Sequence, residues 1–346
     1  MTGLQPHAGC VASEESPRRV LFVRTDRLGE TVLNLPALAA LRGMRPRWHL
    51  TLLVQDSLRE LFEPLVAARQ IDALETTPGL PGHWLADALR LAGHWRSTRY
   101  DVILISNPTK AAHVAAWLAG IRCRVGYDRK WGGLLTHRIL DGKALGGRHE
   151  VEYNLDLVNA LGIHVARAPS VRLPIGSASE QTVAQLLDDA AVKPSDQLVA
   201  VHPWTSNPRK QWPADRVREL LQALAYEPAM RVVLIGGPEE QAQVGALGLM
   251  PDAGRLDFTG RLSIGQLAAL LARVSALVSN DSGPVHVAAA VGTPAIALFG
   301  TTDPATGPGR WGPWGAGHTV IHQPSMEAIS VDDVLSAIRR TVAQTA

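Results

Sequence analysis

Four small or polar residues that could take part in binding or catalysis lie in one short stretch of the chain. Asp281, Ser282, Gly283 and His286 lie between the apolar runs "SALVS" and "PAIALF". Both runs are typical of buried parallel strands. Ligands bind at the carboxyl ends of such strands, and the N–H groups of a helix start suit phosphate. The stretch therefore predicts half of an anion-binding site. In the alternative interpretation, Asp281 and Ser282 only cap a helix, and His286 is a satisfied, half-buried histidine.

The segment between the two apolar runs predicts a helix over residues 285–291. Ser282 or Gly283 is its expected N-cap. Pro284 falls in the first turn, where a missing N–H costs nothing, and Gly292 closes the other end. The whole stretch is therefore expected to form a strand, tight turn, helix, strand unit.

A second polar loop, "WTSNPRKQWP", follows the apolar run "LVAVHP". Thr205 and Ser206 can donate hydrogen bonds to phosphate oxygens, and Lys210 supplies a mobile positive charge. Trp204 and Trp212 are expected to pin the loop by packing. Together with the stretch around Asp281, this loop predicts a two-sided clamp for the diphosphate of a nucleotide donor. The alternative is that Lys210 is an ordinary solvated lysine.

A third polar loop, "RTDRLGETVLNLP", follows the first apolar run of the chain. Gly29 is expected to let the backbone turn tightly. Glu30 would then lie where a carboxylate can accept a proton from a hydroxyl nucleophile. Alternatively, Glu30 only favours the positive end of a helix. The pattern G-x-G-x-x-G is absent, so the loop does not predict a dinucleotide site.

Basic residues outnumber acids between Arg99 and Arg148, with nine Lys or Arg against three Asp. This excess predicts that the first half of the chain attracts an anionic acceptor. Most of these residues taken singly also fit a solvated face. Few aromatic residues are interleaved with them, and the net charge of the whole chain is only +2. Nucleic acid is therefore not an expected partner.

Composition limits the other classes of function. The 346 residues are 46% hydrophobic and 19% charged, as in ordinary globular proteins. Two distant cysteines, Cys10 and Cys123, predict no disulfide framework and fit a reducing compartment. The twelve histidines lack metal-ligand spacing, so no metal is expected. No apolar run approaches the ~20 residues of a membrane span, and the first residues lack a signal-peptide core. The protein is expected to be cytoplasmic.

Strand and helix patterns alternate along the chain in two series, which predicts parallel sheets with right-handed crossovers. We expect a loose tail over 1–17, one doubly wound domain over 18–180 and a second over 181–346. The linker is expected near 175–197, with a ligand cleft between the domains. The last helix, near 330–346, is not assigned to either domain. Expected elements of the first series include the strands "RVLFVRT", "HLTLLV" and "YDVILIS" and the helix "TVLNLPALAALRGM".

Several of these stretches together resemble glycosyltransferase family 9, the heptosyltransferases of lipopolysaccharide core assembly. The resemblance runs from about residue 18 to 313 and is most specific over 280–304. It is carried by "RRVLFVRTDRLGETVLNLPALAALR", "VHPWTSNPRKQWP", "GRHEVEYNLDLVNALG" and "TGRLSIGQLAALLARVSALVSNDSGPVHVAAAVGTPAIALFGTTDP". The family implies an α/β fold of the GT-B type: two Rossmann-like doubly wound domains facing across a cleft, with the acceptor on the first and the nucleotide sugar on the second. It also implies inverting, metal-independent transfer of L-glycero-D-manno-heptose from its ADP conjugate, without a cofactor.

Matching positions carry implied roles. Glu30 stands where the family usually has an aspartate as general base, and Asp26 is a fallback. One extra methylene displaces the carboxylate by roughly an ångström, which can matter greatly to rate. Lys210 matches a diphosphate-binding and catalytic lysine. The other donor-binding positions are Thr205, Ser206, Glu239 or Glu240 near the ribose, Leu262 beside the adenine, Asp281, Ser282, Gly283 and His286.

Acceptor binding is expected on the first domain, at Arg27, Lys110, Arg129 and His149. The implied acceptor is an anionic glycolipid, which would bring the enzyme to the inner face of the cytoplasmic membrane through peripheral contact at most. Three alternatives remain open: a different nucleotide sugar or glycan acceptor on the same fold, a donor-binding protein with little catalysis, and an epimerase.

Overall fold

The structure, a computed structural model, describes residues 18–78, 83–227, 230–247 and 255–345, and the predicted tail over 1–17 lies outside them. The chain divides into two compact units, Met1–Val171 and Arg172–Ala346. The sequence placed this division at residue 180, within a linker near 175–197. Much of that segment is instead a helix, α8 (Ser177–Asp189), which packs against a helix of the second unit.

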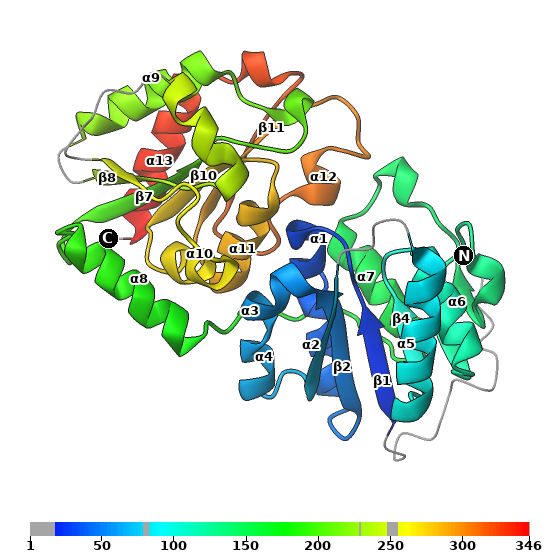
Figure 1. Cartoon of the computed structure of the whole chain (residues 1–346). Helices are drawn as coiled ribbons and strands as arrows, with labels where there is room; N and C mark the ends of the chain where they lie inside the picture. The colour runs from blue at the N-terminus through cyan, green and yellow to red at the C-terminus, as the bar shows by residue number, and fades with distance from the viewer. Residues whose placement is uncertain (1–17, 79–82, 228–229, 248–254, 346) are drawn as a thin grey trace. The chain divides into compact units, whose positions relative to one another are not determined.

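The first unit is built on a parallel sheet of six strands, in the order β3-β2-β1-β4-β5-β6. Figure 1 labels β1, β2 and β4 of this sheet. The order reverses between β1 and β4, as in a Rossmann-type doubly wound sheet. Ligands of such sheets bind beyond the carboxyl ends of the strands at this reversal. The strands are β1 (Arg19–Val23), β2 (His49–Gln55), β3 (Ala73–Thr77), β4 (Val102–Ile105), β5 (Cys123–Tyr127) and β6 (His137–Ile139).

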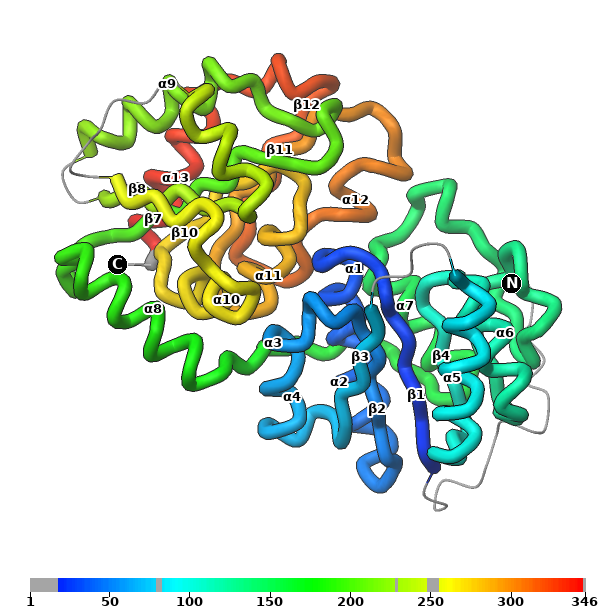
Figure 2. The backbone as a smooth tube through the Cα atoms, in the orientation of Figure 1, coloured from blue at the N-terminus to red at the C-terminus, as the bar shows by residue number. Residues whose placement is uncertain are grey.

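Helices cover both faces of this sheet. Right-handed crossovers place the connections β3 to β4 and β4 to β5 on one face and the earlier connections on the other. The first pair packs side by side as α5 and α6, while α2 packs against α7 (Figure 2). The helices are α1 (Leu28–Val32), α2 (Leu35–Met44), α3 (Arg59–Phe62), α4 (Pro64–Ala67), α5 (Trp84–Thr98), α6 (Lys110–Leu118) and α7 (Glu150–Asn159), with short 3-10 turns η1 (Asp56–Leu58), η2 (Gly132–Leu134) and η3 (Lys143–Leu145).

The helix expected over "TVLNLPALAALRGM" is interrupted. α1 begins earlier, at Leu28, and ends at Val32, and α2 begins at Leu35 with Pro36 in its first turn. Proline lacks the N–H that a continuous helix would use there. Asn34, at the break, donates from its side chain to the Glu30 carbonyl at 2.7 Å. Gly29 is helical and buried, so the expected tight turn at this glycine is wrong; the turn precedes α1.

The second unit has a sheet of the same design, in the order β12-β11-β10-β7-β8-β9, and every pair is parallel. Its order reverses between β7 and β10. The strands are β7 (Gln197–His202), β8 (Met230–Leu234), β9 (Arg255–Asp257), β10 (Ala276–Asn280), β11 (Ala295–Gly300) and β12 (Thr319–Gln323).

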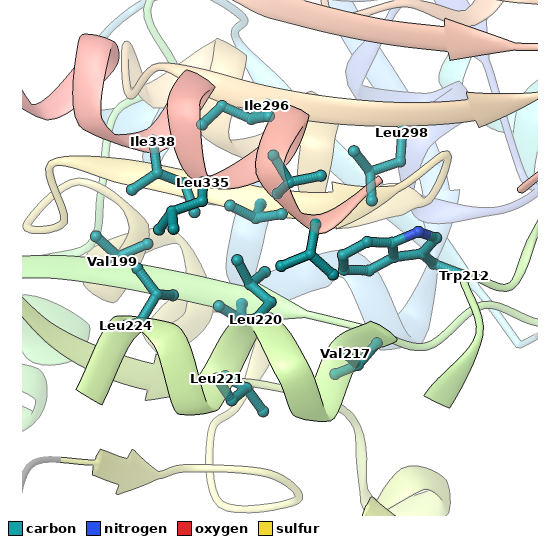
Figure 3. Packing of buried hydrophobic residues seen from close by; sticks show 14 of the residues in the cluster. Val199, Trp212, Val217, Leu220, Leu221, Leu224, Ile296, Leu298, Leu335 and Ile338 are labelled. Carbon is teal, nitrogen blue, oxygen red and sulfur yellow. The ribbon is translucent and has the colours of Figure 1, made fainter. Parts of the chain in front are cut away.

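The last helix, left unassigned by the sequence, packs in the second unit. Leu335 and Ile338 of this helix face Leu220 and Leu224 of α9 on the same side of the strands (Figure 3). These residues belong to one buried cluster that covers one face of the sheet. The helices are α9 (Ala214–Ala225), α10 (Ile264–Leu271), α11 (Gly283–Val291), α12 (Pro308–Trp311) and α13 (Val331–Thr345), with 3-10 turns η4 (Pro208–Lys210), η5 (Pro238–Gln243), η6 (Gly245–Leu247) and η7 (Met326–Ala328).

Two further findings concern the cysteines and the membrane. Cys123, on β5, is buried and disulfide-bonded, so the expectation that the chain's cysteines form no disulfide is wrong for this residue. Cys10 lies outside the described residues. Cysteine usage therefore does not argue for a reducing compartment.

Among the described residues, no helix is both long and apolar enough to span a bilayer.

Candidate active site

The donor-site candidates of the second unit gather where its strand order reverses. β7 and β10 are neighbours, with His202 in register with Ser279. The loop 203–212 leaves the carboxyl end of β7, and Asp281 and Ser282 follow β10 directly. The two loops that the sequence paired as a diphosphate clamp are therefore adjacent.

Buried tryptophans and one asparagine fix the loop 203–212. Trp204 and Trp212 are 3% and 2% exposed, as expected for residues that pin the loop. The Trp212 indole donates to the Ile329 carbonyl at 3.2 Å. Asn280, at the end of β10, accepts from the Trp212 backbone N–H at 3.2 Å and donates to the Pro203 carbonyl at 2.6 Å. One buried side chain thus joins both ends of the loop to β10, a role that the sequence analysis missed.

This loop places Lys210 beside Asp281, and the two side chains form an ion pair. Lys210 is 30% exposed and Asp281 is 9% exposed, so the pair is reached by solvent mainly from the lysine side. Thr205 and Ser206 lie nearer the start of the same loop, where the Thr205 hydroxyl accepts from the Asn207 N–H at 3.3 Å and Ser206 is exposed. Asp281 therefore orients Lys210.

A buried histidine supports the loop that follows β10. The His202 Nδ1 atom lies 3.2 Å from the hydroxyl oxygens of both Ser279 and Ser282, and the two hydroxyls are 2.8 Å apart. Burial lowers the pKa of His202 to about 4, because the imidazolium would lose its hydration. His202 is therefore neutral near pH 7, and it fixes the Ser282 hydroxyl without adding charge.

The expected helix after β10 is present as α11. Ser282 is its N-cap, Gly283 is its first residue and Pro284 lies in the first turn. His286 is buried, at 4% exposure, on the side of the helix facing the unit. Gly292 ends the helix with a φ of 86°, a conformation that favours glycine. The backbone N–H groups at the start of this helix lie at the positive end of the helix dipole. They are beside Asp281, which forms the ion pair with Lys210.

The three residues expected near the nucleoside lie on other loops of the same unit. Leu262 is half-buried and precedes Ser263, the N-cap of α10. Glu239 is exposed in η5. Glu240 accepts a hydrogen bond from the Gly237 N–H and so caps η5. Glu239 is therefore better able than Glu240 to meet a ribose.

In the first unit, the loop after β1 is held by buried polar groups. Arg24 is 4% exposed; its Nε donates to Asp26 at 2.6 Å and its Nη1 donates to the Ser106 hydroxyl at 2.8 Å. The Thr25 N–H donates to Asn107 Oδ1 at 3.1 Å. Ser106 and Asn107 follow β4, so the loop is bonded to the neighbouring strand across the reversal of strand order.

The loop presents two carboxylates. Glu30, in the first turn of α1, is 13% exposed and forms an ion pair with Arg27 at 2.6 Å. Burial raises the pKa of Asp26; Arg24 opposes that shift, and the charge of Glu30 adds to it. The Glu30 and Asp26 carboxylates therefore lie within electrostatic reach of each other.

Behind this loop lies a buried charge network that the sequence analysis missed. Glu150 is 1% exposed and lies 2.7 Å from the Lys143 ammonium and 3.6 Å from Arg24. The Lys143 Nζ atom also lies 4.4 Å from the centroid of the Tyr127 ring. Buried charges are retained where they are paired, as here. "GRHEVEYN" carried the resemblance, but no sequence pattern shows that Glu150 reaches Arg24 across 126 residues of chain.

The four expected acceptor-binding residues occur in different settings. Arg27 is paired with Glu30, and Arg129 is paired with Asp141. His149 is the N-cap of α7, where its Nδ1 accepts from the Val151 N–H at 3.2 Å. Lys110 begins α6 and lies against two tryptophan rings. Within the described ranges, no group of three or more His, Cys, Asp or Glu side chains is placed to hold a metal ion.

Comparison with known proteins identifies the family of this chain. The family model described as glycosyltransferase family 9 (heptosyltransferase) matches residues 88–335. Lipopolysaccharide heptosyltransferase 3 of Escherichia coli is 25% identical over 298 residues, covering 83% of each chain. A solved family 9 glycosyltransferase from Veillonella parvula superposes with a TM-score of 0.85 at 21% identity, covering 96% of this chain and 99% of that one.

A second solved relative, the E. coli heptosyltransferase WaaC with ADP-2-deoxy-2-fluoro heptose, gives a TM-score of 0.69 at 22% identity and covers 93% of this chain and 99% of that one. These likenesses confirm the expected GT-B fold of two Rossmann-like units. The family match covers well over half of the chain. The protein is a glycosyltransferase and belongs to glycosyltransferase family 9, the heptosyltransferase family.

Proposed function

We propose that this enzyme transfers a heptose from ADP-L-glycero-D-manno-heptose to an acceptor of the lipopolysaccharide core, with inversion and without a metal ion. The observation that carries this proposal is the pair Lys210–Asp281 beside the start of α11, at the strand reversal of the second unit. A positive charge and free helix N–H groups at one point suit a diphosphate. The ADP-heptose analogue named for the solved E. coli relative supports the choice of donor.

The reaction begins at the loop after β1. Glu30 accepts the proton of an acceptor hydroxyl, whose oxygen then forms a bond to the anomeric carbon of the heptose. The bond between that carbon and the diphosphate oxygen breaks on the opposite face, and its electron pair leaves with ADP. Attack opposite to the leaving group inverts the anomeric centre. Arg24 supports this step by fixing the loop that carries Asp26 and Glu30.

Charge that grows on the departing diphosphate is stabilised by the second unit. Lys210 contributes its ammonium, and the Ser282 hydroxyl and the N–H groups at the start of α11 contribute hydrogen bonds. Thr205 and Ser206 donate from the adjacent loop. Gly283 and His286 shape the same helix start, Asp281 holds Lys210 and meets sugar hydroxyls, and Leu262 and Glu239 meet the adenosine. This set of groups performs the role that a divalent cation has in metal-dependent transferases.

The acceptor is an anionic glycolipid that binds the first unit through Arg27, Lys110, Arg129 and His149. Such a substrate places the enzyme in the cytoplasm, in peripheral contact with the inner face of the cytoplasmic membrane. The basic excess between Arg99 and Arg148 supports this assignment, because it attracts anions to the unit that carries Glu30.

Calorimetric titration with ADP, UDP and GDP tests the donor assignment. We expect ADP to bind best, and Lys210→Ala to weaken ADP binding by about tenfold to a hundredfold, as for loss of one charge-assisted phosphate contact. Lys193→Ala is the matched control, because Lys193 is exposed and precedes β7 rather than following it. Transfer is then measured with ADP-heptose and a lipopolysaccharide core acceptor, with and without a chelator.

Three outcomes would contradict the proposal. Preferred binding of UDP or GDP would assign another nucleotide sugar to this fold. Release of ADP with no acceptor present, and with an altered sugar, would indicate an epimerase. Intact ADP binding with no transfer to any of several core acceptors would leave a donor-binding protein.

A further inference from the structure

An ammonium group lies between two indole rings at the surface of the first unit. The Lys110 Nζ atom is 3.3 Å from the Trp84 ring centroid and 4.9 Å from that of Trp131. The two rings are stacked, with centroids 6.4 Å apart and planes inclined by 28°. Each tryptophan is 37% exposed, although large aromatic side chains normally bury most of their area. We call Trp84, Lys110 and Trp131 the tryptophan–lysine cluster.

The cluster lies near the carboxyl ends of the strands in the unit that carries Glu30, the candidate base. Trp84 begins α5 and Lys110 begins α6, and both helices run back from the carboxyl ends of the strands. Trp131 directly precedes η2, which packs against α6. Lys110 is three residues after Asn107, whose side chain bonds the backbone of the loop that leads to Glu30. A ligand on the cluster is therefore near this loop within the same unit.

Lys110 differs from the other basic residues expected to bind the acceptor. Arg27 and Arg129 are each paired with a carboxylate, and His149 is used as a helix cap. No carboxylate in the described part of the chain forms an ion pair with Lys110. The ring faces attract the cation and fix its position without neutralising its charge. Such an ammonium is available to an anionic ligand.

From this geometry we propose that the tryptophan–lysine cluster binds a sugar ring of the acceptor that carries a phosphate or carboxylate group. The ammonium binds the anionic group, and the exposed part of an indole packs against the apolar C–H face of the ring. The inference rests on the proposed function, since it assigns a subsite to the acceptor of that reaction. It adds Trp84 and Trp131 as residues that determine acceptor specificity.

Insertion into a lipid bilayer is the competing use of exposed tryptophans, and two neighbours, Leu85 and Leu89, are also exposed on α5. The position of the lysine argues against it. An ammonium 3.3 Å from the Trp84 centroid would have to enter the hydrocarbon with the ring, at a high desolvation cost. A hydrated, anionic sugar imposes no such cost.

Transfer kinetics with a soluble acceptor test the inference. The acceptor is de-O-acylated lipopolysaccharide core oligosaccharide, used with its phosphates and after enzymatic dephosphorylation. We expect Trp84→Ala, Trp131→Ala and Lys110→Gln each to raise the acceptor KM about tenfold, while kcat and the KM for ADP-heptose stay within about twofold. Trp117→Ala is the matched control: Trp117 is 54% exposed on α6, two turns after Lys110 on the same face, and its loss should leave the acceptor KM unchanged.

Dephosphorylation identifies the anion. If phosphate is the ligand of Lys110, the dephosphorylated acceptor shows the raised KM with the wild-type enzyme, and Lys110→Gln adds nothing further. If a carboxylate is the ligand, the full effect of Lys110→Gln persists after dephosphorylation. Either result supports the subsite, and both tryptophan effects should persist in both cases.

An unchanged acceptor KM in all three variants would overturn the inference. If these variants also lost binding to vesicles of phosphatidylglycerol and phosphatidylethanolamine, the cluster would be identified as a membrane-contact surface. If the wild-type enzyme transfers no heptose, the proposed function fails by itself. Calorimetric binding of the same oligosaccharide then decides the inference, since the three variants must still weaken binding and Trp117→Ala must not.

Discussion

At the scale of single residues, Glu30 occupies the position at which the resemblance implies an aspartate as general base. Its carboxylate is 13% exposed and held by Arg27 at 2.6 Å, so it is already oriented without substrate. We predict that Glu30→Gln lowers kcat by about 10²- to 10⁴-fold, the usual worth of a general base, because the amide cannot accept the proton. Binding of ADP should not change, since Glu30 and the residues proposed to bind the donor belong to different units.

The control for this prediction is Asp26→Asn, measured in the same transfer and ADP-binding assays. Asp26 accepts a hydrogen bond from Arg24, and we expect the Asp26→Asn enzyme to lose less activity than the Glu30→Gln enzyme. Near-normal turnover of Glu30→Gln combined with a large loss in Asp26→Asn would reassign the base to Asp26. The raised pKa of Asp26 would then appear as a shift of the acid limb of kcat/KM.

A second residue prediction concerns His202 and pH. Its pKa is lowered from 6.5 to about 4 by burial, so the unfolded chain binds a proton between these values that the folded chain does not. The contribution of neutral His202 is therefore fully present above pH 6.5 and is lost as the pH falls to about 4. By linkage this amounts to roughly 3 kcal/mol of unfolding free energy.

Urea unfolding between pH 4.5 and 7.5 measures this effect. His202→Asn should flatten the decline in unfolding free energy toward low pH, even though it lowers stability at pH 7 through lost packing. His164→Asn is the control, because His164 is exposed and its loss should leave the slope unchanged. Equal slopes in all three proteins would mean that His202 is not held neutral by the fold.

Residue types identified the polar loops but not the residues that hold these loops in place. Lys210, Asp281 and Ser282 stood out because polar groups followed apolar runs. His202, Asn280 and Glu150 did not stand out, because each acts through a partner distant in sequence: Asn280 reaches Pro203, and Glu150 reaches Arg24. The same reason hid the Trp84–Lys110–Trp131 cluster. Spacing within a loop is visible in one sequence, whereas contact between loops depends on strand order.

At the scale of elements, the loop that carries Lys210 depends on a glycine of the next strand connection. A Cβ atom on Gly236 would lie 2.7 Å from the Trp204 ring and 3.0 Å from the Thr259 methyl group. Trp204 is 3% exposed and cannot move without shifting the loop 203–212. We predict that Gly236→Ala lowers the unfolding free energy by about 1–3 kcal/mol, as for other overpacked cores, and weakens ADP binding.

Gly245→Ala provides the comparison, because a Cβ atom there meets nothing within 4 Å. It should leave stability and ADP affinity nearly unchanged, since the substitution adds no contact. Thermal unfolding and calorimetry of the two variants check both statements. An undisturbed ADP affinity in a destabilised Gly236→Ala protein would mean that Trp204 does not position Lys210.

Elements with continuous apolar runs were the most predictable. β1, β2, β4, β10 and β11 are buried along most of their length on both faces, so most of their residues are apolar, and α11 has recognisable cap residues at both ends. β9 and β12, at the two edges of their sheet, were not predicted, because "RLD" and "TVIHQ" are short or alternate with polar residues. The break between α1 and α2 was missed because Pro36 is compatible with a first helical turn, and only the structure shows where that turn begins.

At the scale of the whole molecule, the two units suit different steps of the reaction, because each has its own sheet and its own core. Each unit has the same strand order and its own reversal point, and the charged groups at those points differ: Asp26 and Glu30 in the first unit, Lys210 and Asp281 in the second. Carboxylates suit proton removal, and an ammonium beside a helix start suits a diphosphate. The sequence predicted this two-unit design because its strand–helix rhythm restarts at "LVAVHP".

The strongest consequence of this design is that the second unit should bind the donor alone. Every residue proposed above to bind the donor lies between His202 and His286, and the core that supports these residues draws on residues 199–342 of the same unit. We predict that a protein comprising residues 172–346 folds cooperatively and binds ADP within about threefold of the full-length affinity, while transferring no heptose because it lacks Glu30. Circular dichroism and thermal unfolding establish that the fragment is folded, and calorimetry gives its affinity. A folded fragment whose affinity is about a hundredfold weaker would show that the first unit contributes directly to nucleotide binding. The donor site would then have to be assigned to both units.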